Sequence, residues 1–370
     1  MDIARFTRDT LRPFAARHPR LKSWVVERAR GLDALRHAAS DVFPALIRPR
    51  TRNLTVAITA RCNLRCMGCR YGRDFMPSQQ LPLAVVRDLL DDAATAGVET
   101  IRLYGGEPLL HPDLPAMVEH AVMRGLSPYV TTNATLLERR IDELFAAGLR
   151  TITVGFYGTD EAYDAYTGNR KAFARMERGV AAVRERHGDE VRLRLNWLLM
   201  RPTANDAALD AALDFARRHR AAIQIDLIHY SLPYFSEGPD RCLQFRPEDE
   251  PALRRISERL LAVQRAEPWL LEHSTIGLRA IPDWLLQGRD MRVPCDKYDM
   301  LWIGADGSVQ LCYVTFPLGN LHEKRLAEIL GSPEHVAAAR AAFQLACPNC
   351  HCGYDLRTQK HIPSRWRYGR

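Results

Sequence analysis

The stretch RCNLRCMGCRYG, residues 61–72, brings three cysteines into one loop: Cys62, Cys66 and Cys69. A structural zinc site takes four protein ligands, and an iron–sulfur cube held entirely by protein takes four thiolates. Three thiolates leave one metal corner open to a small molecule. The spacing therefore predicts an iron–sulfur cluster with one exchangeable position, and a zinc site completed by a distant fourth ligand is the alternative.

Strand-like runs alternate with helix-like stretches from about residue 53. Six such repeats predict a parallel sheet with right-handed crossovers, and six units fall short of the eight that close a full barrel. We therefore expect an α/β fold: a partial (β/α)6 barrel with an N-terminal helical segment and a small C-terminal cluster domain built from a hairpin plus helices. The expected strands are residues 53–60, 99–106, 127–133, 150–158, 191–200 and 221–230.

The cysteine loop follows the first expected strand, at the carboxyl end where α/β proteins place their ligands. The second strand ends in YGGEPLL, residues 104–110, whose paired glycines let a backbone edge approach a ligand closely. A plain turn is the simpler interpretation of those glycines. The third strand ends in TTN, residues 131–133, which brings small hydrogen-bonding groups to the same mouth. The three strand ends together predict one shared binding site.

These motifs resemble those of the radical S-adenosylmethionine (SAM) superfamily, over roughly residues 53–235. CNLRCMGC is similar to its cluster loop and YGGEPLL to its glycine-rich SAM contact. The resemblance implies a [4Fe–4S] cluster whose open iron binds SAM. One electron, from a donor such as flavodoxin or ferredoxin, then cleaves SAM to a 5′-deoxyadenosyl radical that takes a hydrogen atom from a substrate. The implied SAM contacts are Gly105, Gly106, Glu107, Pro108, Thr132, Asn133 and Asn196.

One position departs from the family pattern. The residue before the third cysteine is usually aromatic and touches adenine, whereas this chain has Gly68 there. We expect Tyr71 or Phe75 to take over that contact.

A second group of cysteines lies near the C-terminus. Residues 295–320 predict a hairpin around the turn GADGS with one thiol at each end, and CPNCHC follows a helical stretch. This region resembles the SPASM/twitch extension of radical SAM enzymes, and five cysteines suffice for one auxiliary [4Fe–4S] cluster, as in the shorter twitch form. A zinc knuckle is the alternative. The implied ligands are Cys295, Cys312, Cys347 and Cys350, and Cys352 can replace either neighbour.

Composition and charge indicate where the protein is located and which partners it has. The N-terminus has no apolar signal-peptide core and no run of 18 apolar residues occurs, so we expect a cytoplasmic protein without a transmembrane segment. Residues 1–53 hold twelve basic and five acidic side chains, and residues 357–370 hold five basic and none acidic. Because these basic ends lack the interleaved aromatics of base-stacking surfaces, we do not expect a nucleic-acid partner.

The chain is expected to divide into four parts. Residues 1–52 form a basic helical segment, 53–235 the partial barrel, 236–290 a helical connection and 291–370 the auxiliary-cluster domain. Within the first part, one helical face is expected to pack on the core. The residues of that face are Trp24, Val25, Leu32 and Leu35.

The predicted function is hydrogen abstraction from a small molecule such as a sugar, aminocyclitol or nucleoside, giving epimerisation or dehydrogenation. A peptide maturase and an RNA-modifying enzyme are alternatives within the superfamily, and an iron–sulfur electron carrier without catalysis is the alternative outside it. Residues 229–238 are expected to line the barrel mouth. Cys242 belongs to neither cysteine group: it is either a buried thiol used as a small hydrophobe or a catalytic hydrogen-atom donor, which would make the enzyme an epimerase.

Overall fold

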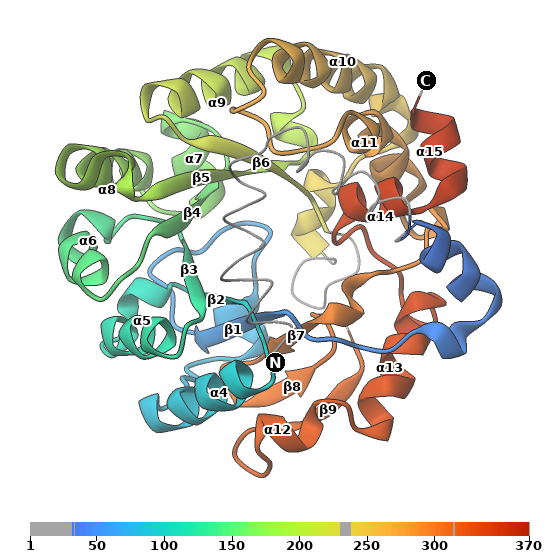
Figure 1. The fold of residues 1–370 in the computed structure, drawn as a ribbon. Coiled ribbons are helices and arrows are strands. Elements are labelled where there is room, and N and C mark those ends of the chain that lie inside the picture. Colours follow the sequence, from blue (N-terminus) through green and yellow to red (C-terminus); the bar gives the residue numbers. More distant parts are fainter. Residues whose placement is uncertain (1–31, 33, 230–237, 314, 370) are drawn as a thin grey trace, which may run out of the picture.

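The computed structural model describes residue 32 and residues 34–229, 238–313 and 315–369 (Figure 1). Six parallel strands form a curved sheet in sequence order, so the predicted partial (β/α)6 barrel is confirmed. Each strand lies within the run that predicted it. The strands are β1 (Asn53–Thr59), β2 (Thr100–Gly105), β3 (Ser127–Thr132), β4 (Thr151–Phe156), β5 (Arg192–Leu199) and β6 (Ala222–Leu227).

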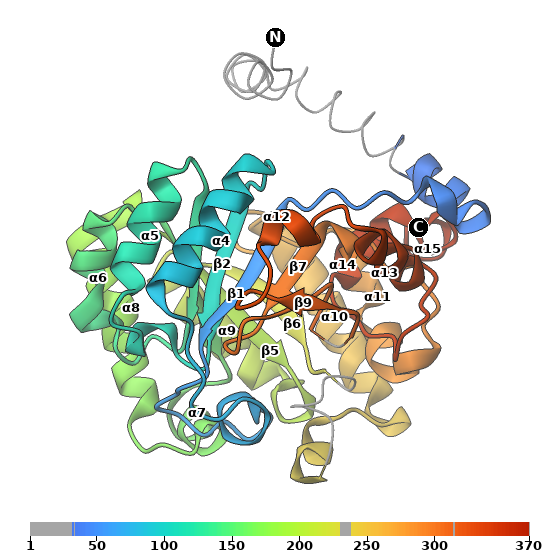
Figure 2. The same ribbon diagram turned by 90° about the horizontal axis from the view of Figure 1, so that it is seen from below.

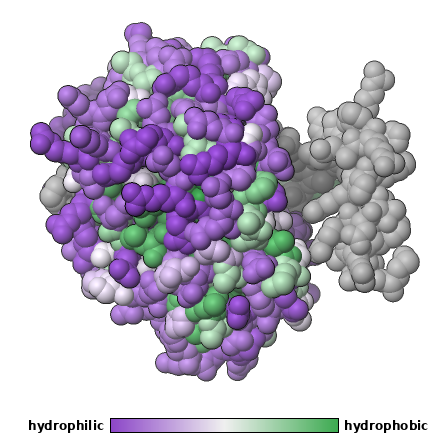
Figure 3. Space-filling view, turned by 90° about the vertical axis from the view of Figure 1, so that its left-hand side faces the viewer, coloured by the Kyte–Doolittle hydropathy of each residue, from purple (hydrophilic) through white to green (hydrophobic). Residues whose placement is uncertain are grey.

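Helices cover the outer face of this sheet. Apolar side chains at helical spacing on each helix pack against the outward side chains of the strands, such as Leu54, Val56 and Ile58 of β1. The opposite, solvent-facing sides are mainly hydrophilic (Figure 3). The barrel helices are α4 (Leu83–Thr95), α5 (Leu114–Met123), α6 (Leu137–Ala146), α7 (Asp160–Thr167), α8 (Ala172–His187) and α9 (Asp206–Arg218), and α10 (Glu250–Ala266) and α11 (Thr275–Gln287) follow β6.

The C-terminal hairpin continues the barrel sheet. Strand β7 (Met300–Ile303) pairs in parallel with β1, and β8 (Ser308–Gln310) and β9 (Pro317–Asn320) add antiparallel neighbours, so the nine strands run in the order β6-β5-β4-β3-β2-β1-β7-β8-β9. The predicted hairpin is therefore present, but it also extends the sheet at its β1 edge. This pairing places the second cysteine group beside the strand that leads into the first.

The last helices anchor the hairpin to the barrel. Helix α12 (Leu326–Ile329) lies next to α4 (Figure 2), where Arg325 Nη2 lies 2.8 Å from Asp92 Oδ1. The Trp284 indole on α11 donates a hydrogen bond of 3.0 Å to Thr358 Oγ1 on α14. The remaining helices are α13 (Pro333–Phe343), α14 (Tyr354–Lys360) and α15 (Ile362–Tyr368). No helix in the described part of the chain is both long and apolar enough to cross a membrane.

The N-terminal segment packs by a different face from the one expected. Residues 34–42 are helical, but Leu32 and Leu35 are 67% and 62% exposed, so the expectation that they face the core is wrong. Ala34 and His37 form the buried side instead, where the His37 ring meets Phe343 of α13 at 5.0 Å. The other two residues of the expected face, Trp24 and Val25, lie outside the described residues.

Candidate active site

The loop that carries the first three cysteines is fixed by backbone hydrogen bonds to the end of α7. The N–H groups of Arg65 and Met67 donate to the carbonyls of Thr167 and Tyr166 at 2.9 and 2.8 Å. The Arg73 guanidinium donates to the carbonyl oxygens at positions 66 and 69. Hydrogen bonds within the protein therefore hold the loop in a defined shape.

The three thiols of this loop lie close enough to influence one another's ionisation. Burial raises the pKa of the Cys62 thiol to about 12, and the nearby charges of Glu107 and Cys69 oppose its ionisation further. Burial likewise raises the pKa of Cys66, with Cys69 and Cys62 adding to the effect. Thiolates this close together repel one another, and bound metal cations offset that repulsion. The donor set therefore fits a cluster that takes three thiolates.

The paired glycines of YGGEPLL lie against the cysteine loop. Gly105 has a φ of +141°, and a Cβ there would come within 2.1 Å of the Thr59 carbonyl oxygen. A Cβ on Gly106 would come within 2.3 Å of the Arg61 carbonyl oxygen. The N–H groups of Gly106 and Glu107 donate to those two carbonyls, at 2.8 Å each. The glycines are therefore required for contact between the β2 turn and the cluster loop.

The side chain of Glu107 ties the β2 turn to the end of β3. It is fully buried, and its carboxylate accepts hydrogen bonds from Thr132 Oγ1 at 2.6 Å, from the Asn133 N–H at 2.8 Å and from the Leu109 N–H at 3.0 Å. Burial raises its pKa to about 7, although these three hydrogen bonds oppose the rise. Sequence reasoning missed this role of the Glu107 side chain because its three donors lie on two different loops. Pro108 is also buried, at the start of the short 3-10 helix Pro108–Leu110.

An amide network joins the β3 end to the cluster loop. Asn133 Nδ2 donates to Asn63 Oδ1 at 2.9 Å, and Asn63 Nδ2 donates to Thr135 Oγ1 at 2.9 Å. Thr132 is buried behind this network, with its hydroxyl engaged by Glu107. The structure thus brings the three predicted strand ends together, and it adds Asn63, a residue of the CNLRCMGC motif to which the sequence assigned no role.

Two aromatics were expected to replace the adenine contact missing at Gly68. Tyr71 is 3% exposed, its hydroxyl accepts from the Ala305 N–H at 3.2 Å, and its ring meets Trp302 edge-on. Tyr71 is therefore a core residue beneath the hairpin. Phe75 is half-buried, with its ring 6.1 Å from that of Tyr71, and it remains the aromatic candidate for this contact.

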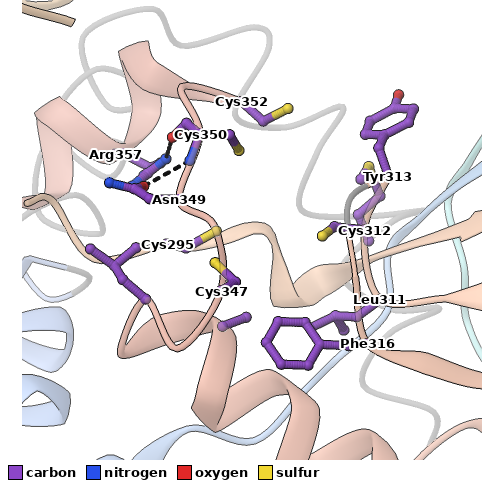
Figure 4. Close-up of a pocket in the computed structure, with 13 residues that line it drawn as sticks. Cys295, Leu311, Cys312, Tyr313, Phe316, Cys347, Asn349, Cys350, Cys352 and Arg357 are labelled. Atoms are coloured by element: carbon purple, nitrogen blue, oxygen red, sulfur yellow. Dashed lines mark hydrogen bonds between the residues drawn. The ribbon is translucent and has the colours of Figure 1, made fainter. Parts of the chain in front are cut away.

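The second cysteine group lines a single hollow at the C-terminal end of the fold. All five cysteines face it, together with apolar side chains such as Leu311 and Phe316 (Figure 4). The thiols come from the segment before β7, from the turn after β8 and from the loop between α13 and α14. Three separate segments converging on one hollow with five thiols fit an iron–sulfur cluster. These residues are Cys295, Cys312, Cys347, Cys350 and Cys352.

A buried arginine and asparagine hold the walls of this hollow. Arg357 is fully buried and donates to the carbonyl oxygens of Val293, Pro294 and Cys350. Asn349 Nδ2 donates to the Met291 carbonyl oxygen at 3.1 Å. Both residues join the segment that carries Cys295 to the CPNC loop. Asn349 belongs to that loop, whereas Arg357 lies in α14 outside the motif.

Cys352 differs from the other thiols of the hollow because it also contacts a histidine. Its Sγ lies 3.3 Å from His229 Nε2. It also interacts with the thiol of Cys350, which raises the pKa of Cys350, and burial adds to that effect. Cys352 therefore sits between a cysteine and an imidazole at one side of the hollow. Residues 230–237, most of the stretch expected to line the mouth, lie outside the described residues.

The two other predicted site residues, Asn196 and Cys242, lie in different surroundings. Asn196 Nδ2 donates to Asp226 Oδ2 at 3.1 Å, so this amide is oriented by β6. Cys242 is exposed, and its Sγ lies 3.7 Å from the sulfur of Met67 in the cluster loop. Exposure does not support the buried-hydrophobe interpretation of Cys242, and its contact brings it to the loop of the first cysteine group.

An aromatic cluster fills the space between the two cysteine groups. Trp302 of β7 donates through its indole N–H to the hydroxyl of Tyr104, and its ring lies 6.2 Å from that of Tyr313. Cys69 packs against one side of this cluster, and Tyr313 lines the hollow of the second group. The parallel pairing of β7 with β1 creates the contact of Trp302 with Tyr104, which lie 198 positions apart in the sequence.

A single metal ion has no ready site in either group. Within residues 32, 34–229, 238–313 and 315–369, no set of three or more His, Cys, Asp and Glu side chains is placed to hold one ion.

Two family models match the chain. The model of the radical SAM superfamily matches residues 56–216, and that of an iron–sulfur cluster-binding domain, SPASM, matches residues 295–352. Together they cover more than half of the chain and include every cysteine described above except Cys242. The second model does not distinguish the shorter twitch form.

Curated relatives match over part of their length. A GTP 3′,8-cyclase of Chlorobaculum tepidum is 32% identical over 171 residues, covering 46% of this chain and 51% of that protein. An Fe-coproporphyrin III synthase of Methanosarcina barkeri is 33% identical over 139 residues, covering 37% of this chain and 35% of that protein. The matched stretch thus spans about half of the cyclase and a third of the synthase.

A solved structure shares the fold over a larger part of this chain than the two curated relatives match. The crystal structure of Streptococcus suis SuiB bound to the precursor peptide SuiA superposes with a TM-score of 0.63 at 16% identity, covering 82% of this chain and 70% of that chain. At this identity the comparison bears on the fold alone. The radical SAM family brings with it a SAM-binding [4Fe–4S] cluster and SAM, and the second domain brings an auxiliary iron–sulfur cluster. The chain belongs to the radical SAM superfamily and carries a C-terminal SPASM iron–sulfur cluster-binding domain.

Proposed function

We propose that this protein is a radical SAM enzyme that removes a hydrogen atom from a small-molecule substrate held in the barrel. The observation that carries the proposal is the fixed three-thiol loop at the barrel mouth, locked to the β2 turn by two 2.8 Å backbone hydrogen bonds. When bound there, the cluster supplies one electron that cleaves SAM to the hydrogen-abstracting 5′-deoxyadenosyl radical. The proposed cluster ligands are Cys62, Cys66 and Cys69.

The chain's own residues position SAM and exclude water from it. We assign the backbone of Gly105, Gly106 and Glu107 to the methionine end of SAM, and Asn133 to its ribose or carboxylate. The buried Glu107 carboxylate holds Thr132 and the Asn133 backbone in place, so these two act on SAM through a preorganised β3 turn. Phe75 is the aromatic that we assign to adenine.

A small-molecule substrate is supported by the names of the curated relatives, which specify GTP and a coproporphyrin. A sugar, aminocyclitol or nucleoside remains the proposed class for this chain. The same chemistry serves peptide maturation and RNA modification, so both classes belong in a substrate panel. We place the enzyme in the cytoplasm with a flavodoxin or ferredoxin as its electron donor.

The product depends on the fate of the substrate radical. If Cys242 donates a hydrogen atom from its thiol to that radical, the carbon is inverted and the enzyme is an epimerase. The thiol radical that remains would then take up one electron and one proton, and an auxiliary cluster held by Cys295, Cys312, Cys347 and Cys350 would supply the electron. If no thiol donates, loss of one electron and one proton from the substrate radical gives a dehydrogenated product. The contact of Cys242 with the cluster loop supports the first route.

The test is anaerobic incubation with SAM, dithionite and deuterated candidate substrates. Transfer of deuterium into 5′-deoxyadenosine with one candidate is expected, and it identifies both the substrate and the bond attacked. A matched control is Cys66→Ala, which should abolish deoxyadenosine formation. Uncoupled SAM cleavage with every small molecule, together with deuterium transfer from a peptide or RNA, would reject the small-molecule assignment.

A further inference from the structure

A charged side chain lies inside the barrel without an ionic partner in the described structure. Arg102 of β2 is level with Thr55 of β1 and Tyr129 of β3, and Thr55 is level with Trp302 of β7. Because partners in a parallel sheet share a face, Arg102 points to the inner side, where Trp302 belongs to the aromatic cluster.

The contacts of Arg102 use only part of its hydrogen-bonding capacity. Its Nε donates to Thr131 Oγ1 at 2.9 Å and its Nη1 donates to the Tyr313 hydroxyl at 2.9 Å. The guanidinium also lies over the Tyr104 ring, 4.7 Å from its centre. A guanidinium carries five N–H donors, so three remain. Within the described residues Nη2 makes no hydrogen bond, so its two N–H groups can donate to a ligand.

The described acidic side chains near Arg102 do not form an ion pair with it. Among the described residues, no Asp or Glu forms an ion pair with Arg102, and Asp226, whose charge reaches it, is held by Asn196. Arg194, on the same face of the sheet in β5, is paired with Glu272 at 3.3 Å. A half-buried cation that lacks a contacting counter-ion is costly, and the tyrosine ring offsets only part of that cost.

The free donors favour one kind of ligand. Nη1 and Nη2 form the end of a planar fork that matches the two oxygens of a carboxylate. A phosphate dianion is usually bound by further cations or by a run of free backbone N–H groups. Here the N–H of Gly106, at the nearby turn, is already donated to the Thr59 carbonyl oxygen.

We propose that Arg102 binds a carboxylate of the substrate inside the barrel, between the two cysteine groups. Thr131 adjoins the residues assigned to SAM, and Tyr313 lines the auxiliary hollow, so a ligand on Arg102 lies between both cofactor sites. Naming this ligand a substrate rests on the proposed function, whereas the anion site itself does not.

The test measures binding of trifluoroacetate to the reconstituted holoenzyme with SAM by ¹⁹F NMR. Saturable binding is expected for the wild type and for Arg178→Gln, a control that removes an exposed arginine of α8. Binding should weaken about ten- to a hundredfold in Arg102→Gln, the loss expected for a charge-assisted pair of hydrogen bonds. Trifluoroethanol, the neutral analogue, should not bind saturably, and monofluorophosphate should bind more weakly than trifluoroacetate.

Each contrary result overturns a defined part of the inference. The site is rejected if the wild type shows no saturable trifluoroacetate binding or if Arg102→Gln binds trifluoroacetate equally well. If monofluorophosphate binds more tightly than trifluoroacetate, the ligand of Arg102 is a phosphate rather than a carboxylate. If Arg102→Gln does not fold, Arg102→Lys provides the test, because lysine keeps the charge but lacks the planar guanidinium fork. An unchanged affinity of Arg102→Lys for trifluoroacetate would contradict the bidentate contact. SAM cleavage is measured on the same samples, so a wild type that binds trifluoroacetate but does not cleave SAM refutes the proposed function while the anion site stands.

Discussion

Replacing Gly106 by alanine tests how the cluster loop is held. The added Cβ would lie 2.3 Å from the Arg61 carbonyl oxygen and 2.6 Å from that of Ala60. Since carbon contacts settle near 3.5 Å, the loop must retreat by roughly 1 Å. That movement breaks the two 2.8 Å hydrogen bonds that the N–H groups of Gly106 and Glu107 donate to the loop region.

The magnitude can be worked out from these contacts. Two lost backbone hydrogen bonds cost about 1 kcal/mol each, and forced overpacking adds about 1–3 kcal/mol. We expect the free energy of unfolding to fall by about 3–5 kcal/mol, and the first cluster to be lost while the auxiliary cluster stays. Denaturant unfolding of the apoprotein and iron analysis of the reconstituted protein measure the two effects.

Gly97→Ala is the matched control. Gly97, unlike Gly106, has a positive φ, +79°, and a Cβ there meets nothing within 4 Å. Only the backbone conformation is penalised, by about 1–2 kcal/mol, and iron content should stay at the wild-type value. If Gly106→Ala and Gly97→Ala have the same free energy of unfolding, iron content and SAM cleavage, then the close packing of the β2 turn on the cluster loop does not hold the cluster site.

Three further predictions concern single side chains. Cys242→Ala should still cleave SAM and consume substrate but yield unepimerised product, which chromatography measures. If this variant forms the normal product at the normal rate, thiol donation by Cys242 is excluded. Cys350→Ala should lose the iron of the auxiliary cluster. Cys352→Ala should keep it, because the Cys352 thiol contacts His229 instead. An equal loss of iron in both variants would make Cys352 a ligand as well. Burial lowers the pKa of His37 from 6.5 to about 4, so its neutral form is favoured in the folded state and stability falls as the pH drops below 6.5. Between pH 7 and pH 5 this loss is about 2 kcal/mol, and denaturant unfolding of His37→Gln should lack it; an identical pH slope in both proteins would contradict the assignment.

The sequence predicts the barrel well because its signals are local. Each strand is a short run rich in β-branched or other large apolar residues, such as NLTVAIT in β1 and RLRLNWLL in β5. The cysteine, glycine and TTN motifs end consecutive parallel strands, which must meet at one edge. The grouping of CNLRCMGC, YGGEPLL and TTN therefore needs no tertiary information. Cys295 and CPNCHC could be grouped on the same basis, through a hairpin and one helix.

The interactions that the sequence does not reveal are long-range. The pairing of β7 with β1 joins residues about 245 positions apart, and it decides that Tyr71 is buried beneath Trp302 rather than exposed to a ligand. The Glu107 carboxylate and the Arg357 guanidinium are ordinary charged residues in a sequence, and only the fold shows them buried among backbone groups. The packing face of residues 34–42 depends likewise on the position of α13.

Iron and sulfide content after anaerobic reconstitution tests the two-cluster account most directly. The wild type should hold about eight iron and eight sulfide per chain, from two four-iron clusters. Replacing Cys62, Cys66 and Cys69 together by alanine should halve both values and abolish SAM cleavage. Replacing Cys295, Cys312, Cys347 and Cys350 together should halve the iron while the first cluster still cleaves SAM. Bound zinc with only about four iron per chain in the wild type would contradict the auxiliary cluster.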